Sequence, residues 1–523
     1  MLFSEDTWKR WAEQEDINYK LTKNKSGGTI KKYLKKGYTH FDHKFWFPDR
    51  QGELKQILND GLKVFHKVHG RLETYAFSPF IKVLIKTPRY KYQATEGEFA
   101  LETKIRPICY AAHLDSLIFG FYAFALNEKY QQYITKIGID EAVLAYRTDL
   151  DGKCNIQFSK EVFDEVKRRG NCTAIALDIK GYFDHIDHKI LKEKWQQVIG
   201  GLLPEDQLKI YKRLTQYSYT SKNSILKKYG VKLKKLKTPP RTLLDLVPGA
   251  KDYLKYQQLR NDRLIVTNDK PDKKTGTMIG IPQGSAMSAL LSNIYLICYD
   301  EMMITKGKEE GFLYRRYCDD ILIICDADKA EKLQQFAIKK IDDDCHLEIQ
   351  PRKVELTEFR KNSAGKVRAF NKKKMLEKSL LVTDASNEKY FYKSLQYLGF
   401  EYNGQDIFIR SSSLSRYFIK LRARIVKTIS MAYSDKSTSN QIFKEQLFHK
   451  YTHLGKRNFL TYAYNASKKS YQNSKGVSKE GMNSQAIRKQ LSRHFEHLIR
   501  VLNIKNEQRF IWKGTKAPTL KKV

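Results

Sequence analysis

The sequence has little of what marks a secreted, zinc-binding or membrane protein. Its seven cysteines are scattered without a Cys-x-x-Cys pair, so neither a disulfide framework nor a zinc site is indicated. The longest apolar stretch, residues 114–126, is too short to span a bilayer, and residues 1–6 are acidic and lack a secretory pattern. We therefore expect a cytoplasmic protein without a membrane-spanning segment.

Acidic residues are few relative to basic ones, which favours a negatively charged binding partner. The 523 residues include 96 Lys and Arg against 58 Asp and Glu, a net charge of +38. This excess favours binding to phosphate backbones with release of counterions, and so predicts a salt-dependent affinity for nucleic acid. The basic runs at 227–237 and 372–374 either contribute to a nucleic-acid-binding surface or are simply solvated. The 32 tyrosines suit stacking with single-stranded bases.

The most informative feature is a pair of carboxylates between two apolar runs. Asp319 and Asp320 end the segment YCDD, which has FLY at 312–314 before it and ILII at 321–324 after it, so two strands are expected to meet there. Acidic pairs are ordinary in surface turns. A further carboxylate, Asp178, however, follows the apolar run TAIAL, which also predicts a buried strand. Two strand ends can then present three carboxylates together.

Clustered carboxylates require cations. Three of them repel one another and stay ionised at neutral pH only with positive charge among them. Oxygen ligands suit Mg²⁺, and two such ions activate an attacking hydroxyl and stabilise the leaving oxygen of an in-line phosphoryl displacement. We therefore expect two Mg²⁺ ions, replaceable by Mn²⁺, and nucleotidyl transfer. The predicted metal-binding positions are Asp178, Ile179, Asp319 and Asp320.

Further motifs, in order along the chain, resemble those of the reverse transcriptases. Residues 178–184 (DIKGYFD) look like the family's first catalytic motif and residues 280–285 (GIPQGS) like its second, with YCDD as the third. Residues 347–353 (LEIQPRK) are similar to the fourth motif, and residues 397–400 (YLGF) to the hydrophobic grip on the primer strand. The resemblance implies an RNA-directed DNA polymerase that uses an RNA template and deoxynucleoside triphosphates to make a DNA product.

The resemblance also implies the architecture. The family has an α/β (α+β) right-hand polymerase fold, with fingers, an antiparallel-sheet palm and a helical thumb. We expect an N-terminal helical region at 1–60, fingers at 61–170, and a palm at 171–405 with a basic helical insertion at about 200–275. Residues 406–523 would form the helical thumb and a basic C-terminal extension.

Two motifs predict how the nucleotide is held. By resemblance, Phe183 is the aromatic gate under the incoming sugar, where RNA-dependent RNA polymerases place an aspartate for the 2′-hydroxyl, so deoxynucleotides are favoured. Asp184 comes one residue later, and capping of the following helix is its better interpretation. Gly280 and Gly284 flank a Pro-Gln turn that lets the backbone approach a base pair or sugar, and Gln283 offers a donor and an acceptor.

Other candidate residues bind phosphate or the primer. Arg106 in KIRPI and Arg147 in AYR look like the finger residues that clamp a triphosphate, since guanidinium forks match phosphate oxygens. A surface arginine is otherwise usually just solvated. Lys353 matches a lysine that protonates departing pyrophosphate. The predicted primer grip consists of Tyr397, Leu398 and Gly399.

The type of reverse transcriptase follows by elimination. No cysteine follows Cys345, which argues against a C-terminal Cys/His nuclease module, and the acid-poor tail argues against an RNase H domain. The Val-Thr-Gly segment of retron enzymes is absent. What remains resembles the bacterial abortive-infection and defence-associated reverse transcriptases, which implies an antiphage role and a structured non-coding RNA as partner.

Alternatives stay open at this point. The same site is compatible with untemplated or protein-primed DNA synthesis, with ribonucleotide addition, or with a non-catalytic RNA-binding scaffold. The presence of Asp178, Asp319 and Asp320 argues against the scaffold. Homo-oligomers are compatible with the sequence, but no heptad pattern sets a stoichiometry.

The gate assignment predicts the effect of a single substitution. Phe183→Ala removes the ring that excludes the 2′-hydroxyl, so incorporation of ribonucleotides should rise relative to deoxynucleotides. Primer extension with each nucleotide class measures the ratio. A ratio unchanged from the wild type would contradict the assignment.

Overall fold

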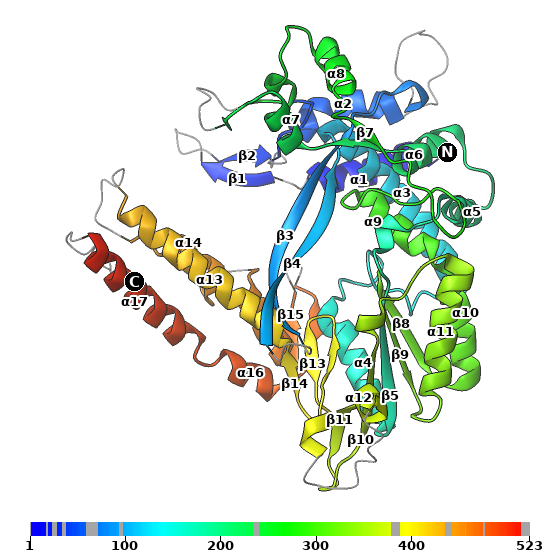
Figure 1. Ribbon diagram of the computed structural model, residues 1–523, viewed down its shortest axis with the longest axis vertical. Coiled ribbons are helices and arrows are strands. Elements are labelled where there is room, and N and C mark those ends of the chain that lie inside the picture. The colour runs from blue at the N-terminus through cyan, green and yellow to red at the C-terminus, as the bar shows by residue number, and fades with distance from the viewer. Residues whose placement is uncertain are drawn as a thin grey trace.

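A computed structural model describes residues 2–16, 19–23, 29–33, 38–58, 72–93, 98–233, 240–377, 388–434, 442–455, 457–473 and 476–513. Lys234, Lys235 and Lys237 of the predicted basic run lie outside these residues. Figure 1 shows two lobes joined by helices and spanned by the long hairpin of β3 and β4, with α13 and α17 extending to one side.

The lower lobe is built on an antiparallel sheet with the strand order β11-β10-β5-β9-β8. Its strands are β5 (Cys172–Asp178), β8 (Leu313–Tyr317), β9 (Asp320–Cys325), β10 (Glu355–Lys361) and β11 (Val367–Asn371). Alternate residues enter two cores: Ile175 and Ile323 join the first core, whereas Ala174 and Ile324 join the second. Because both faces are buried, these strands appear in the sequence as continuous apolar runs.

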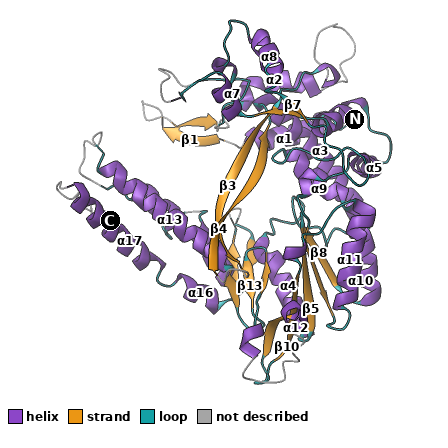
Figure 2. Cartoon of the chain, in the orientation of Figure 1, coloured by secondary structure: helices purple, strands orange, loops and turns teal. Residues whose placement is uncertain are grey.

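Helices cover both faces of the sheet (Figure 2). The first core is completed by α1 (Glu5–Asp16), α2 (Phe47–Leu58), α3 (His113–Lys136), α5 (His188–Ile199), α6 (Glu205–Thr215), α9 (Ala286–Tyr295), α10 (Ile297–Glu310) and α11 (Ala330–Cys345). The second is completed by α4 (Asn155–Arg169), β12 (Leu395–Tyr397), β13 (Phe400–Tyr402), β14 (Ile407–Ile409), α13 (Ser411–Ala432), α14 (Glu445–Tyr451), α15 (Phe459–Ser467), α16 (Gln485–Leu491) and α17 (His494–Lys513). None of the helices described is both long and apolar enough to cross a bilayer.

The upper lobe contains a four-stranded sheet with the order β4-β3-β6-β7. Its strands are β3 (Phe80–Gln93), β4 (Glu98–Tyr110), β6 (Ser218–Thr220) and β7 (Val266–Thr267), and nearby helices are α7 (Lys222–Lys228) and α8 (Asp252–Asn261). Because β6 pairs with β3, the predicted insertion at about 200–275 returns to the sheet that contains β4.

Short elements interrupt two regions that were expected to be helical. The N-terminal region contains the hairpin of β1 (Tyr19–Lys23) and β2 (Thr29–Tyr33), and the C-terminal region that of β15 (Ser470–Gln472) and β16 (Ser478–Glu480). A short helix, α12 (Lys372–Glu377), follows β11. Strands of three to five residues contain too few periods of alternation to be separated from loops by pattern.

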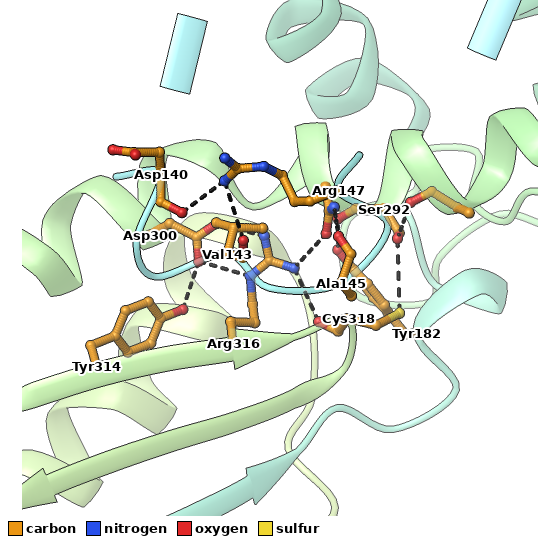
Figure 3. Close-up of polar contacts among 12 residues, drawn as sticks. Asp140, Val143, Ala145, Arg147, Tyr182, Ser292, Asp300, Tyr314, Arg316 and Cys318 are labelled. Carbon is orange, nitrogen blue, oxygen red and sulfur yellow. Dashed lines mark hydrogen bonds and ion pairs between the residues drawn. The ribbon is translucent and has the colours of Figure 1, made fainter. Parts of the chain in front are cut away.

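A fully buried ion pair fixes the end of β8 (Figure 3). The Arg316 guanidinium donates to both carboxylate oxygens of Asp300, at 2.8 and 2.6 Å. The Tyr314 hydroxyl donates to the same carboxylate at 2.6 Å. The remaining guanidinium nitrogen donates to the side chain of Asn293 and to the carbonyl of Cys318, each at 3.1 Å. One guanidinium therefore joins β8, α9 and α10 to the turn before Asp319.

The same arginine anchors the segment that follows α3. Its backbone N–H donates to the Ala142 carbonyl at 2.8 Å, and its carbonyl accepts from Leu144 N–H at 2.9 Å. The Asn293 side chain donates to the Ala145 carbonyl at 2.7 Å. The segment between α3 and α4 is thus held against β8, the edge strand of the lower-lobe sheet.

Breaking this pair should destabilise the protein strongly. Asp300→Ala leaves an uncompensated buried charge, so we expect a loss of about 3–5 kcal/mol in the free energy of unfolding. Urea denaturation measures it. Lys340→Ala, which removes an exposed ion pair with Asp344, is the matched control and should change stability by less than about 0.5 kcal/mol. Equal effects of the two substitutions would contradict the anchoring role.

Candidate active site

The strand ends bring the three predicted carboxylates together. Asp178, the last residue of β5, lies opposite Asp320, the first residue of β9, in antiparallel register. Asp319 precedes it in a two-residue turn in which Cys318 has a φ of 58°. Directly opposed residues have Cα atoms about 4.5–5.5 Å apart, and Ile179 N–H donates to the Asp319 carbonyl at 3.2 Å. The backbone therefore sets all three side by side.

Burial and like charge raise the pKa of two of these carboxyls. Burial is the largest cause for Asp319, followed among the raising effects by the charge of Asp178. The pKa of Asp320 is raised to about 6, first by burial and then by the charges of Asp319 and Asp178. Solvent reaches the Asp320 side chain, so its loss of hydration comes from protein atoms around an open site. The arrangement favours binding of positive charge.

Lys353 supplies one such charge. It ends the 3-10 helix η5 (Pro351–Lys353), and its Nζ donates to Asp178 Oδ1 in an ion pair. Gln350 N–H donates to the Asp178 carbonyl at 2.8 Å, so the fourth motif lies against the first. Within the described ranges, no three His, Cys, Asp or Glu side chains are arranged to hold a metal ion. The Asp178 carboxylate is paired with Lys353 instead.

The loop of the first motif is bonded to that of the second. Phe183 lies in the 3-10 helix η2 (Tyr182–Asp184) and is half-buried against the first core. Its carbonyl accepts from Ile281 N–H at 2.9 Å. Tyr182, which is buried, donates to the Ser292 carbonyl. These contacts hold the backbone of Phe183 beside the second motif.

Two glycines allow the second motif to pack closely. Gly284 has a φ of 121°, and a Cβ there would lie 2.8 Å from the Cys109 carbonyl oxygen. Gly280 has a φ of 95°, and its Cβ would lie 3.2 Å from the Asp184 carbonyl oxygen. Gln283 lies between them, half-buried, and its carbonyl accepts from Cys109 N–H at 2.8 Å. The loop therefore joins the first motif to β4.

The two predicted triphosphate-binding arginines differ in their surroundings. Arg106 lies on β4, half-buried, and its guanidinium has no hydrogen-bond or ion-pair partner among the residues described. The Arg147 side chain is only 2% exposed and pairs with Asp149. It also donates to the carbonyls of Asp140 and Val143, at 2.7 and 3.3 Å. The structure does not bring Arg147 to the site, because these partners hold its side chain within its own loop (Figure 3).

The predicted primer grip is a tight hairpin at the edge of the site. Leu398 and Gly399 join β12 to β13 and have φ values of 41° and 94°, as in a type I′ turn. Ser159 on α4 donates to the Tyr397 carbonyl at 3.2 Å. The pKa of Tyr397 is raised by burial and then by the carboxylate of Asp320. The hairpin thus lies within electrostatic reach of the carboxylates.

The helix cap differs from the expectation. Asp187, not Asp184, caps α5, since its Oδ1 accepts from the N–H groups of Lys189 and Ile190 at 2.8 and 3.2 Å. Asp184 instead lies in η2, where its backbone N–H donates to the Gly181 carbonyl at 2.8 Å. Its own carbonyl oxygen packs against Gly280. The position of Asp187 directly before the apolar helical pattern was the signal for this cap.

Two further residues near the carboxylates were not identified from the sequence. Tyr146 has a φ of 59° and is partly exposed. The pKa of its phenol is raised by partial loss of hydration and by the neighbouring Cys318 and Asp319. Arg410, before α13, lowers the pKa of Asp320 and so opposes the carboxylates around it. Tyr146 lies in the AYR segment but was not singled out there, and Arg410 lies outside the recognised motifs; both reach the site through tertiary structure.

Comparison with known proteins adds only a distant similarity of fold. No family model and no curated protein matches the chain. Apo telomerase from Candida tropicalis, truncated from its C-terminal domain, is 10% identical at a TM-score of 0.36, over 64% of this chain and 56% of that one. Telomerase from Candida albicans in complex with a TWJ fragment of telomeric RNA is 12% identical at 0.36, over 83% and 57%.

A viral protein is similar to the same degree. The sicinivirus 3Dpol RNA-dependent RNA polymerase is 9% identical at a TM-score of 0.32, over 77% of this chain and 61% of that one. The chain therefore spans less than two thirds of each of these structures. It is a mixed α/β protein, and its function is inferred below from the residues of its site.

Proposed function

We propose that the protein is an RNA-directed DNA polymerase that adds deoxynucleotides by two-metal nucleotidyl transfer. The observation that carries the proposal is the register of β5 and β9, which sets Asp178 opposite Asp320 with Asp319 beside them. The loops with Phe183 and Gln283 are bonded to each other at these strand ends. An acidic centre next to positions for a sugar and a base pair suits templated addition of nucleotides.

The donor chemistry of the site fits Mg²⁺. The carboxylates of Asp178, Asp319 and Asp320 and the backbone carbonyl of Ile179 are hard oxygen ligands. Negative charge among these groups contributes to the raised pKa of Asp319 and Asp320, and a divalent cation would offset that repulsion. When bound, two Mg²⁺ ions activate the attacking hydroxyl and stabilise the leaving oxygen. Because Asp178 pairs with Lys353, metal binding requires this ion pair to open or to be shared.

The chain's own residues then bind and orient the reactants. Arg106 binds triphosphate oxygens with its guanidinium, which has no hydrogen-bond or ion-pair partner among the described residues. Lys353, next to Asp178, donates a proton from Nζ to the departing pyrophosphate. Phe183 excludes a 2′-hydroxyl, and Gln283 contacts the base pair or sugar. The hairpin at 397–400 holds the primer strand. Arg147 has a structural role, because its donors are used within its own loop.

We also propose a biological setting. The motif resemblance to defence-associated reverse transcriptases and the net charge of +38 favour a bacterial antiphage role, in the cytoplasm, on a bound structured non-coding RNA. The RNA would be recognised through its shape and single-stranded loops. Two other functions use the same chain: untemplated or protein-primed DNA synthesis, and a non-catalytic RNA-binding scaffold. The register that sets Asp178 opposite Asp320, with Asp319 next to it, favours catalysis over the scaffold.

The raised pKa of Asp320 predicts a pH dependence of stability that Mg²⁺ abolishes. The folded value of about 6 lies above the ordinary value of 3.8, so the folded state holds more protons between them, and the stability due to this group falls as pH rises through that range. In EDTA, the urea midpoint of the wild type should fall more from about pH 4.5 to about pH 6.5 than that of Asp320→Asn. Mg²⁺ should remove the difference. Equal pH dependence of the two proteins in EDTA would contradict the raised pKa.

The proposed activity is tested on protein purified with the RNA that it retains. Mg²⁺ and one labelled deoxynucleotide or ribonucleotide at a time are added, and the products are sequenced. We expect DNA that maps to the retained RNA, made with deoxynucleotides only. The Asp319→Ala, Asp320→Ala double variant should make no product, because it lacks two of the three carboxylates.

The products also separate the alternatives. DNA of a single repeated base, or DNA attached to the protein, would establish untemplated or protein-primed synthesis at the same carboxylates. Equal product from the double variant would exclude these carboxylates as the active site. Retained RNA without any product from the wild type would favour the scaffold.

A further inference from the structure

Arg410 connects the primer-grip hairpin to the first residue of α13. It follows β14, and its backbone N–H donates to the Gly399 carbonyl at 2.9 Å. From this position and the contacts below, we infer that Arg410 binds a backbone phosphate of the growing strand next to its 3′ end. The inference rests on the proposed function and extends it to a residue outside the recognised motifs.

Helix α4 fixes the distance between this hairpin and the carboxylates. Ser159 on α4 donates to the carbonyl of Tyr397 at 3.2 Å. Tyr397 is the last residue of β12 and pairs with Phe400 across the turn of the hairpin. Phe158, the residue before Ser159, has its ring centroid 6.5 Å from that of Tyr317, at the end of β8. One turn of α4 therefore contacts both hairpins. Arg410, bonded to the grip hairpin, is held in a constant relation to the turn with Asp319.

No described residue engages the charge of Arg410. Its guanidinium is exposed and has no hydrogen-bond or ion-pair partner in the described part of the chain. Glu401 on β13 is engaged by Ser411 N–H and by the Gln396 side chain, each at 3.0 Å. All the guanidinium donors of Arg410 thus face solvent beside the site, where they match phosphate oxygens.

The position favours the growing strand over the incoming triphosphate. Arg106 lies on β4, which is hydrogen-bonded to the loop of Gln283, and Lys353 forms an ion pair with Asp178. In the proposed site, both residues contact the incoming nucleotide. Arg410 belongs to the grip hairpin. The attacking 3′-hydroxyl must lie at the carboxylates, so the phosphodiester behind it lies between them and the grip. A guanidinium there both holds the strand and offsets the charge of Asp320.

The test separates binding from synthesis. A fluorescent DNA primer annealed to an RNA template is titrated with wild type, Arg410→Gln and Arg410→Lys without nucleotide, at several salt concentrations. We expect Arg410→Gln to weaken binding about tenfold and to reduce the salt slope by about one. Arg410→Lys should restore the slope and part of the affinity. The KM for the deoxynucleotide should stay within about twofold of the wild type.

Arg168→Gln is the matched control. It removes the same charge from an exposed arginine on α4 that pairs with Glu165, and it should bind as the wild type does. Wild-type affinity in Arg410→Gln would overturn the inference, as would a raised KM with unchanged primer binding, which would place Arg410 on the triphosphate. Binding is measured without catalysis, so absence of synthesis by the wild type would count against the proposed function and not against Arg410.

Discussion

The candidate site depends on the buried ion pair of Arg316 and Asp300. Desolvating two charges is costly, and their attraction offsets that cost only with good geometry and full hydrogen bonding. Here the guanidinium donates to both carboxylate oxygens in a bidentate arrangement, Tyr314 donates to the same carboxylate, and Asn293 accepts from the guanidinium (Figure 3). One donor holds the carbonyl that precedes Asp319. An apolar pair would fill the same volume, but it would leave that carbonyl, and therefore the turn, without a fixed position.

A second constraint is electrostatic, since the negative charge of the three carboxylates is only partly balanced by nearby positive side chains. After burial, the charge of Asp178 raises the pKa of Asp319, and the charges of Asp319 and Asp178 raise the pKa of Asp320. Lys353 and Arg410 act in the opposite direction from two different elements. Neither side chain is buried, so both are able to move. The site is therefore a rigid set of backbone positions with exchangeable positive charge around it, which suits successive binding and release of phosphates.

The sequence was sufficient where the information is local. Apolar runs that end in Asp178 and before Asp319 predicted strand ends, because residues buried on both faces leave a continuous pattern. The orientation of side chains, in contrast, depends on contacts that are distant in the sequence or on the exact path of a loop. Arg147 and Arg316 are both arginines near aromatic residues, yet neither faces a substrate site, since partners far along the chain or in its own loop capture their donors. The placement of Arg410 beside Asp320 depends likewise on the packing of α4 between two hairpins, which no spacing encodes.

Three of the eight described non-glycine residues with positive φ lie around the same centre. Tyr146, Cys318 and Leu398 have positive φ although none is glycine, and each adjoins the carboxylates or the grip. Such conformations cost on the order of 1–3 kcal/mol each and persist only where the surroundings over-determine them. The surroundings here are specific: Ala145 and Arg147 are held on either side of Tyr146, Arg316 holds Cys318, and Arg410 binds the residue after Leu398. Stability has thus been given up at three points to place a phenol, a carboxylate turn and the hairpin at 397–400 near one another. A purely structural scaffold would have no reason to retain that cost, whereas a site that must align two reactants gains from it.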